Sequence, residues 1–280
     1  MNTVQKLSGK RALITGSGTG IGREIALEFA RQGADVVLHY LHEQEGAFSA
    51  REEIRGLGRR CEAFQADFDD IEAAVGLGEQ AIAFLGGIDC LVNNSGITFN
   101  KPFLDVTPEQ FDRLYHVNVR AQYFLTQRIA KDMLTHGGGA VCNISSIHGV
   151  SGAPEHSVYA GTKGALIAQT RSLAVELAHQ GIRINAIAPG WVTVENYHQA
   201  IPGFNEGGAR QAAADLVPLG RSGEKLDIAK LAVFLCSEDA AFIIGQTIVA
   251  DGGTTALMSL ISDFRSKSTA SFGKGYVPGI

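Results

Sequence analysis

The chain has 280 residues, of which 45% are hydrophobic and 19% are charged, and its formal net charge is −5. This composition is typical of a soluble globular protein, and it gives no reason to expect nucleic acid or an anionic membrane as a partner. No apolar run reaches the roughly 18 residues of a membrane span, and the first ten residues lack the apolar centre of a secretion signal. We therefore expect a cytoplasmic protein.

Four cysteines lie far apart in the chain, without a CxxC pair. Three of them fall in strand-like runs, so we expect reduced, buried thiols and neither disulfides nor a metal site. The cysteines are Cys61, Cys90, Cys142 and Cys236.

Short apolar runs alternate with longer segments of helical period. The runs predict strands at 11–15, 34–40, 61–67, 88–94, 140–146, 182–189 and 246–253. The other segments predict helices near 20–32, 43–57, 69–85, 108–135, 157–179 and 225–236, with an irregular segment after 189. This alternation predicts an α/β fold with a seven-stranded, parallel, doubly wound sheet and helices on both faces. We expect one Rossmann-type catalytic domain over 1–255 and a C-terminal extension over 256–280.

A glycine-rich turn, TGSGTGIG at 15–22, follows the first strand and opens the first helix. Its spacing, G-x-x-x-G-x-G, differs from the common G-x-G-x-x-G, although the mechanics are the same. Gly16 permits the tight turn, while Gly20 and Gly22 let the backbone approach a pyrophosphate at the helix N-terminus. A turn needed only for packing is the alternative, and the position after strand one favours a nucleotide.

Two further stretches end neighbouring strands, ADF at 66–68 and NNSG at 93–96. Ligands of open parallel sheets bind outside the carboxyl ends of the strands, so we expect both stretches beside the glycine turn. The carboxylate of Asp67 is placed there to accept from an adenine amino group. The expected cofactor contacts along this edge are Gly16, Ser17, Thr19, Gly20, Ile21, Gly22, Tyr40, Asp67, Phe68, Asn94, Ser95, Gly96, Tyr159, Lys163, Pro189, Gly190 and Val192.

Tyr159 and Lys163 lie four residues apart in HSVYAGTKGALIAQ, so they share one face of a predicted helix. Hydride transfer at a carbinol needs a base for the hydroxyl proton. Free tyrosine has a pKa of about 10, and a nearby cation favours the phenolate. An interfacial tyrosine with a solvated lysine is the alternative for a lone pair at this spacing. However, Ser146 ends strand five on the same sheet edge, and Asn118 lies within the long helix, where a buried asparagine usually distorts the helix or binds water.

These motifs together resemble the short-chain dehydrogenase/reductase family over about residues 8–255. The motifs are TGSGTGIG, NNSG, Asn118, Ser146, YAGTK and the Pro189–Gly190 pair, and the thirteen residues from Ser146 to Tyr159 also match the family. The resemblance implies the sheet order 3-2-1-4-5-6-7, a bound NAD or NADP and a homotetramer.

The resemblance also implies a role for each member of the catalytic tetrad. Tyr159 is expected to be the general acid and base, and Lys163 to lower its pKa and bind the ribose. Ser146 is expected to orient the carbonyl of the substrate. Asn118 is expected to hold a water that relays protons from Lys163.

The end of the second strand decides between NAD and NADP. NAD users of the family tend to carry an acid there, which binds the ribose hydroxyls, but this chain has Tyr40. Thr19 and Leu41 stand where NADP users often carry a basic residue, and only His39 and His42 are basic candidates nearby. Nothing anionic would repel a 2′-phosphate, so we favour NADP, with dual use as the alternative.

The substrate side of such folds is built after strands five and six, where this sequence is mostly polar. Paired donors and acceptors suit a polyhydroxy compound, so we expect a small polar substrate such as a sugar, polyol or sugar acid. A 3-oxoacyl-thioester reductase and a non-catalytic, cofactor-sensing subunit are the alternatives. The expected substrate contacts are Ser146, His148, Glu155, Tyr159, Trp191 and Asn196.

Two features depart from the family pattern. The threonine that often stands five residues past Pro189 is replaced by Val194, with Thr193 one position earlier. Either the loop shifts, or a backbone contact at Val192 takes over. The segment 195–220 is a candidate lid. The tail beyond 255 is a candidate arm onto a neighbouring subunit, with a disordered tail as the alternative.

Overall fold

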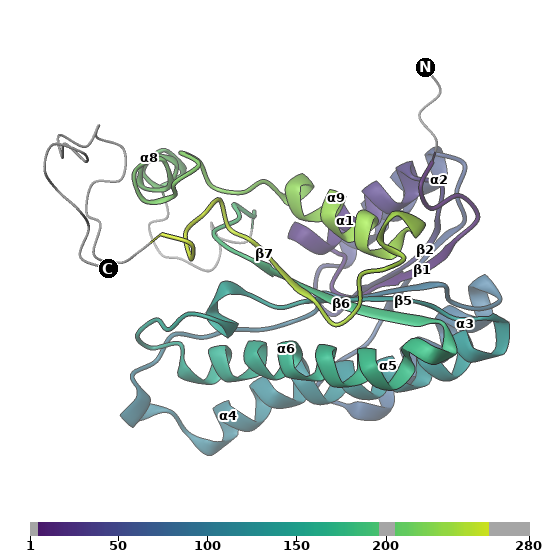
Figure 1. Cartoon of the computed structure of the whole chain (residues 1–280), viewed down its shortest axis with the longest axis horizontal. Coiled ribbons are helices and arrows are strands. Elements are labelled where there is room, and N and C mark those ends of the chain that lie inside the picture. Colours follow the sequence, from purple (N-terminus) through teal and green to yellow (C-terminus); the bar gives the residue numbers. More distant parts are fainter. Residues whose placement is uncertain (1–4, 196–204, 258–280) are drawn as a thin grey trace, which may run out of the picture.

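The computed structural model describes residues 5–195 and 205–257 (Figure 1). Its strands are β1 (Arg11–Ile14), β2 (Asp35–Tyr40), β3 (Cys61–Gln65), β4 (Cys90–Asn93), β5 (Gly139–Ile144), β6 (Ile182–Pro189) and β7 (Thr247–Ala250). All pairings are parallel, and the order β3-β2-β1-β4-β5-β6-β7 confirms the predicted sheet.

Helices cover both faces of this sheet. They are α1 (Gly20–Arg31), α2 (Gln44–Gly56), α3 (Ile71–Leu85), α4 (Pro108–Tyr115), α5 (Ala121–Met133), α6 (Ser157–Leu177), α8 (Glu206–Leu216) and α9 (Lys225–Cys236). Short 3-10 turns span Phe103–Asp105, Leu134–His136, Ile147–Gly149, Ala178–Gln180 and Glu238–Ala240. Figure 1 shows α1, α2 and α9 on one side of the sheet and α3, α5 and α6 on the other.

Two apolar clusters hold these layers together, one on each face of the sheet. In the first, Ile25 and Phe29 of α1 pack with Val233 of α9. In the second, Leu77 of α3 packs with Leu125 of α5. Because the strands are buried on both faces, their sequences are nearly continuous apolar runs. The rigid sheet therefore presents the carboxyl ends of its strands at one edge.

The cysteines and the helices give two further facts about the described residues. All four cysteines are buried, free thiols, as predicted. Burial raises the pKa of Cys61 and of Cys142 to about 12, so both stay protonated at neutral pH. Within residues 5–195 and 205–257, no helix is both long and apolar enough to cross a membrane.

The helix predicted near 108–135 is present, but a π-helical turn at His116–Arg120 divides it into α4 and α5. Asn118 lies in that turn and is fully buried. Its Nδ2 donates to the carbonyl of Ile97 (2.9 Å) and to Oγ1 of Thr162 (3.1 Å), and its Oδ1 accepts from the Ile97 N–H (2.8 Å). A π-helical turn contains one residue more than an α-helical turn. We attribute it to these bonds, because an asparagine side chain competes with the regular hydrogen bonds of a helix.

The segment after β6 contains a helix that the sequence did not predict. Asn205 caps α8 by accepting from the N–H of Gly208 over 3.2 Å. Two glycines in the first turn, Gly207 and Gly208, lower helix propensity and hid this helix. Residues 196–204 of the candidate lid, with Asn196, lie outside the described residues. The candidate arm from 258 onward does so as well.

The close packing of the glycine turn gives a stability prediction. A Cβ at Gly22 would overlap the carbonyl oxygen of Gly16 and the side-chain amide of Asn94. We expect Gly22→Ala to lower the free energy of unfolding by about 1–3 kcal/mol, because this overlap outweighs the gain in helix propensity. Gly76→Ala in α3 is the control, since a Cβ there meets nothing within 4 Å. Urea denaturation measures both, and equal stabilities would contradict the tight turn.

Candidate active site

A cleft of about 920 Å³ lies along the carboxyl edge of the sheet. Its walls come from the loops that follow β4, β5 and β6 and from the start of α6. Ser146, Tyr159 and Lys163 all line it, so the structure brings three of the four predicted catalytic residues together. Asn118 lies directly behind its wall, because a Cβ at Gly96 would be 3.3 Å from Asn118 Oδ1.

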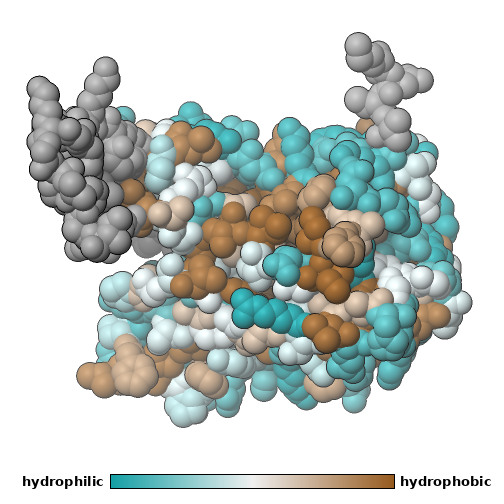
Figure 2. All heavy atoms as spheres, in the orientation of Figure 1, coloured by the Kyte–Doolittle hydropathy of each residue, from teal (hydrophilic) through white to brown (hydrophobic). Residues whose placement is uncertain are grey.

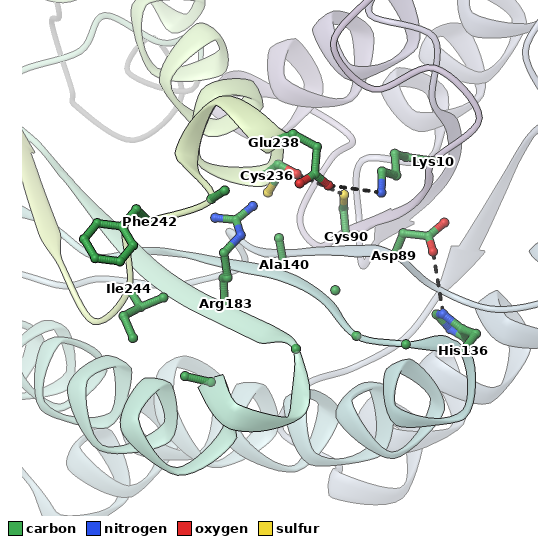
Figure 3. Close-up of a pocket in the computed structure, with 16 residues that line it drawn as sticks. Lys10, Asp89, Cys90, His136, Ala140, Arg183, Cys236, Glu238, Phe242 and Ile244 are labelled. Carbon is green, nitrogen blue, oxygen red and sulfur yellow. Dashed lines mark hydrogen bonds and ion pairs between the residues drawn. The ribbon is translucent and has the colours of Figure 1, made fainter.

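A second hollow of about 660 Å³ lies at the opposite edge, where β4, β5 and β6 begin (Figure 3). Its charged side chains are engaged with each other or with backbone. Asp89 contacts His136 over 3.7 Å and Lys10 contacts Glu238 over 3.6 Å. The guanidinium of Arg183 donates to three backbone carbonyls. The cleft at the carboxyl edge is therefore the candidate active site.

Lys163 is a buried cation inside that cleft. Lys163 is only 4% exposed. Its Nζ donates to the carbonyl of Ile144, at the end of β5, over 2.8 Å. Burial lowers the pKa of Lys163 to about 8, so the amine remains mostly charged at neutral pH. Nζ lies 5.6 Å from the centre of the Tyr159 ring, which puts the ammonium beside the phenol as the helical spacing predicts.

Ser146 follows β5 in an extended conformation and is 8% exposed. Its hydroxyl oxygen accepts from the N–H of His148 over 3.2 Å. This bond leaves the hydroxyl hydrogen for another acceptor, and the residue lines the cleft beside Tyr159. Ser146 is thus positioned to donate to a substrate oxygen.

The glycine turn between β1 and α1 is fixed by side chains from neighbouring strands. Asn94 Nδ2 donates to the carbonyls of Thr15 and Gly16, each over 3.0 Å. Gly20 has a positive φ of 59°, and α1 begins at this residue. A glycine is needed for that conformation, and the helix N-terminus behind it attracts anions. The turn therefore fits the pyrophosphate of a dinucleotide.

Two of the expected cofactor residues have largely buried side chains. Ser17 is fully buried, and its hydroxyl donates to the carbonyl of Ile14 over 2.9 Å while its N–H donates to the carbonyl of His39. Tyr40 is 7% exposed and packs edge-on against Phe48 at 5.9 Å between ring centres. Both side chains therefore contribute to packing within the fold.

The other expected cofactor contacts differ in exposure, and some of them line the cleft. Asp67 is exposed, and its Oδ1 accepts from the N–H of Asp69 over 2.9 Å. Phe68 is buried and stacks on His39 at 4.4 Å, so His39, a basic candidate for the 2′-phosphate, lies inside the protein. Further contacts that line the cleft are Ile21, Asn94, Gly96, Pro189, Gly190 and Val192.

Glu43 is an acidic residue that the sequence analysis did not consider for this edge. A Cβ at Gly18 in the glycine turn would lie 2.8 Å from the Cβ of Glu43. Glu43 thus approaches the turn through its β-carbon, and an acidic side chain that faces the ribose favours its hydroxyls over a 2′-phosphate. The preference for NADP considered the end of the second strand and did not weigh Glu43.

Some of the predicted substrate residues line the cleft in the structure, and one of them does not. His148 lines the cleft, stacks on His156 at 4.5 Å and meets the Tyr159 ring edge-on at 5.7 Å. Burial and the neighbouring His156 ring lower the pKa of His148. Trp191 also lines the cleft, but Glu155 is exposed and is not among the lining residues.

The loop after β4 contributes residues that the sequence analysis missed. Ile97, Thr98, Phe99 and Asn100 all line the cleft. Their position directly after NNSG, at the carboxyl end of a strand, could have indicated this, because such loops form the binding sites of parallel sheets. They add apolar surface to a site that the sequence described as mostly polar.

The loop after β6 shows whether Thr193 takes the place of the threonine that the family often carries five residues past Pro189. Thr193 faces away from the lining residues, since its Oγ1 lies 2.9 Å from Oγ of Ser222 and its N–H donates to the carbonyl of Gly223. Val192 and Val194 line the cleft instead. Val194 also covers the glycine turn, because a Cβ at Gly20 would be 3.6 Å from its Cγ1.

Comparison with known proteins identifies relatives over nearly the whole chain. A family model described as enoyl-(acyl carrier protein) reductase matches residues 16–255. A trihydroxynaphthalene reductase of Pestalotiopsis fici is 36% identical over 254 residues, which cover 88% of this chain and 89% of that protein. Versicolorin reductase 1 of Aspergillus parasiticus is 36% identical over 260 residues, which cover 90% of this chain and 99% of that protein.

Solved structures agree with these relatives. A 7α-hydroxysteroid dehydrogenase complexed with NADH and 7-oxo glycochenodeoxycholic acid is 35% identical, with a TM-score of 0.83 over 89% of this chain and 96% of that one. A blue fluorescent protein from a metagenomic library, in complex with NADPH, is 34% identical, with a TM-score of 0.82 over 89% and 99% of the two chains. With its parallel sheet, glycine turn and paired tyrosine and lysine, the chain belongs to the short-chain dehydrogenase/reductase family and is an NAD(P)-dependent oxidoreductase.

Proposed function

We propose that the chain interconverts a secondary alcohol and a ketone on a flat ring, with Tyr159 as the general acid and base. The observation that carries this proposal is the grouping of Tyr159, Lys163 and Ser146 in one cleft with aromatic and imidazole side chains. The dinucleotide, when bound, supplies or accepts the hydride at the ring carbon. The side chains of the cleft handle the proton and the substrate oxygen.

Each of these three residues has a role that its surroundings support. The Ser146 hydroxyl donates to the substrate oxygen and orients it. The Tyr159 hydroxyl gives a proton to that oxygen in reduction and takes it back in oxidation. The buried ammonium of Lys163 stabilises the phenolate left by proton release, because the charges are close and shielded from water.

Asn118 acts by positioning other groups. Its side chain makes three hydrogen bonds to protein and so ties the loop at Ile97 to Thr162 of α6. This leaves the side-chain amide little capacity for a relay water. We therefore assign a proton-relay water to the backbone of the π-helical turn rather than to the side chain of Asn118.

The cleft lining supports a ring as the substrate. Phe99, Ile147 and Trp191 supply apolar surface, and the stacked pair of His148 and His156 supplies a flat face. Among the described residues, His148 lines the cleft and has one buried ring nitrogen, Nδ1, without a hydrogen-bond partner. The relatives named after hydroxynaphthalene and versicolorin reduction point to the same class.

A sugar, polyol or sugar acid is the second candidate. Thr98, Asn100 and the two cleft histidines offer donors and acceptors for several hydroxyls. The aromatic and aliphatic side chains nearby make this candidate the weaker one, since they leave fewer partners for a polyhydroxy compound.

A substrate panel tests this proposal. We expect the wild type to reduce a hydroxylated bicyclic ketone with a kcat/KM at least about tenfold above an aldose, a sugar acid or a 3-oxoacyl thioester. NADH and NADPH are each supplied, and the ratio of their kcat/KM values reports the effect of Glu43. Preferred turnover of the sugars or of the thioester would contradict the ring-ketone proposal.

The same assay with Tyr159→Phe tests the catalytic role. We expect kcat to fall by about 10²–10⁴-fold, while the Kd of the dinucleotide stays within about threefold of wild type. Tyr123→Phe, which removes an exposed phenol from α5, is the matched control. Unchanged turnover in Tyr159→Phe would exclude this tyrosine as the acid and base, and no turnover in wild type would favour a cofactor-sensing subunit.

We also propose that the chain forms a homotetramer, because it exposes two separate apolar patches. One lies on α4 and α5, with Phe111, Tyr123 and Phe124 exposed. The other lies at the edge strand β7, with Phe242 fully exposed and Val249 at 40%. Figure 2 shows apolar surface gathered over α9 and β7 on this face. Two patches that each meet a copy of themselves build a tetramer with two-fold axes.

Light scattering tests this assembly. We expect Phe124→Glu and Phe242→Glu each to convert the tetramer into dimers, since each places charges in one of the two interfaces. Leu57→Glu is the control, because Leu57 is 45% exposed at the end of α2, away from both patches. A monomeric wild type would contradict the proposal.

A further inference from the structure

His39, near the end of β2, is a buried histidine with no part in the proton transfer described above. It is 3% exposed. Its ring stacks on Phe68 with 4.4 Å between ring centres and 10° between ring planes. A histidine buried this deeply needs partners for both nitrogens, since an unpaired polar atom in an apolar site is costly.

Both ring nitrogens have such partners. The N–H of Gly16 donates to Nδ1 over 3.0 Å, and the Ser95 hydroxyl lies 3.1 Å from the same nitrogen. Nε2 lies 3.0 Å from the carbonyl oxygen of Ala66. A backbone N–H only donates and a carbonyl only accepts, so Nδ1 must be without hydrogen and Nε2 must carry it. The imidazole is therefore held as one neutral tautomer.

The charges around the ring do not alter this state at neutral pH. Glu43 and Asp67 are the charged groups that act on it, and both carboxylates favour the imidazolium. Burial opposes them and is the larger effect, so the pKa of His39 is lowered to about 4. Neither nitrogen is available to contact a phosphate.

The bonds of His39 join three loops at the carboxyl edge. Gly16 belongs to the turn after β1, Ala66 follows β3, and Ser95 follows β4. The backbone of His39 adds a further link, because its N–H donates to the hydroxyl of Ser17 over 2.9 Å. These are the loops that the sequence analysis assigned to the pyrophosphate and the adenine.

We propose that His39 is a positioning residue for the dinucleotide, whose neutral imidazole fixes the Gly16 turn against the loops after β3 and β4. This inference rests on the proposed function, because it takes the glycine turn as the pyrophosphate site. The bond to Gly16 sets the direction of the turn that leads into α1. The bond to Ala66 holds the loop at Asp67 in register with it.

Three substitutions separate the two bonds. His39→Leu removes both. His39→Asn keeps an acceptor near the position of Nδ1 for the N–H of Gly16, but its side chain is too short to reach Ala66. His39→Gln places an amide near the position of Nε2, within reach of Ala66, and lacks the acceptor for Gly16. His179→Leu, at an exposed histidine in the turn before β6, is the control.

Fluorescence titration with NADPH and with NADH at pH 7.5 measures the effect. We expect His39→Leu to raise the Kd by about tenfold, with kcat at saturating dinucleotide within about threefold of wild type. His39→Asn should stay within about threefold of the wild-type Kd, and His39→Gln should resemble His39→Leu. A purely structural role predicts the opposite order, since Gln matches the volume of the ring better than Asn.

The outcomes are distinguishable from a failure of the proposed function. A wild type that binds neither dinucleotide overturns the proposed function and this inference with it. A wild type that binds and turns over, with a folded His39→Leu whose Kd is within twofold, overturns the role of His39 alone. If His39→Leu does not fold, the comparison of Asn with Gln decides, and a tighter Kd for Gln overturns the proposal.

Discussion

The proposed active site depends on one buried cation. The ammonium of Lys163 has lost most of its hydration, and within the protein the carbonyl of Ile144 at the end of β5 accepts from it. A charge in this setting acts strongly on a neighbouring phenol, because little water screens it. The site thus needs a fold that places a helix face directly over the carboxyl end of a central strand, and the doubly wound sheet supplies it.

The residues next to Lys163 are packed closely around its ammonium. A side chain at Gly96 would begin 3.5 Å from Nζ of Lys163 and 3.3 Å from Oδ1 of Asn118, so this position stays open. Asn118 distorts its own helix to hold the backbone of Ile97 and the hydroxyl of Thr162. The irregular turn therefore costs helix regularity and stabilises the wall of the cleft.

The cofactor edge follows a related logic, in which short side chains and tight turns bring several backbone segments together. Asn94 and His39 come from different strands, and both bond to Gly16. The histidine stays neutral because burial outweighs two nearby carboxylates. The loops proposed to bind the dinucleotide are thus held by the interior of the protein.

The sequence predicted the seven strands and the face shared by Tyr159 and Lys163, because period and helical spacing are local properties. The order of the strands followed from the resemblance to the short-chain dehydrogenase/reductase family. The sequence indicated that Asn118 distorts its helix or binds water, but not that the distortion is a π-helical turn, because Asn118 bonds there to residues distant in the chain. It missed the places of Glu43 and Phe99 for the same reason, since neither belongs to a motif. His39 was considered only as a basic residue near the cofactor, because the residues that bury it, Phe68, Gly16 and Ala66, lie on other elements. The helix α8 was hidden by two glycines in its first turn.

The free energy of unfolding of Lys163→Met, measured against pH, tests the buried cation most directly. Burial lowers the pKa of Lys163 from 10.5 to about 8, so the unfolded chain binds one more proton between these values. The penalty on the wild-type fold is therefore complete below pH 8 and disappears as the pH rises to 10.5. We predict that inactive Lys163→Met is about 1–3 kcal/mol more stable than wild type at pH 7, and that the difference closes between pH 8 and 10.5. A less stable variant, or a difference that does not change with pH, would contradict the account.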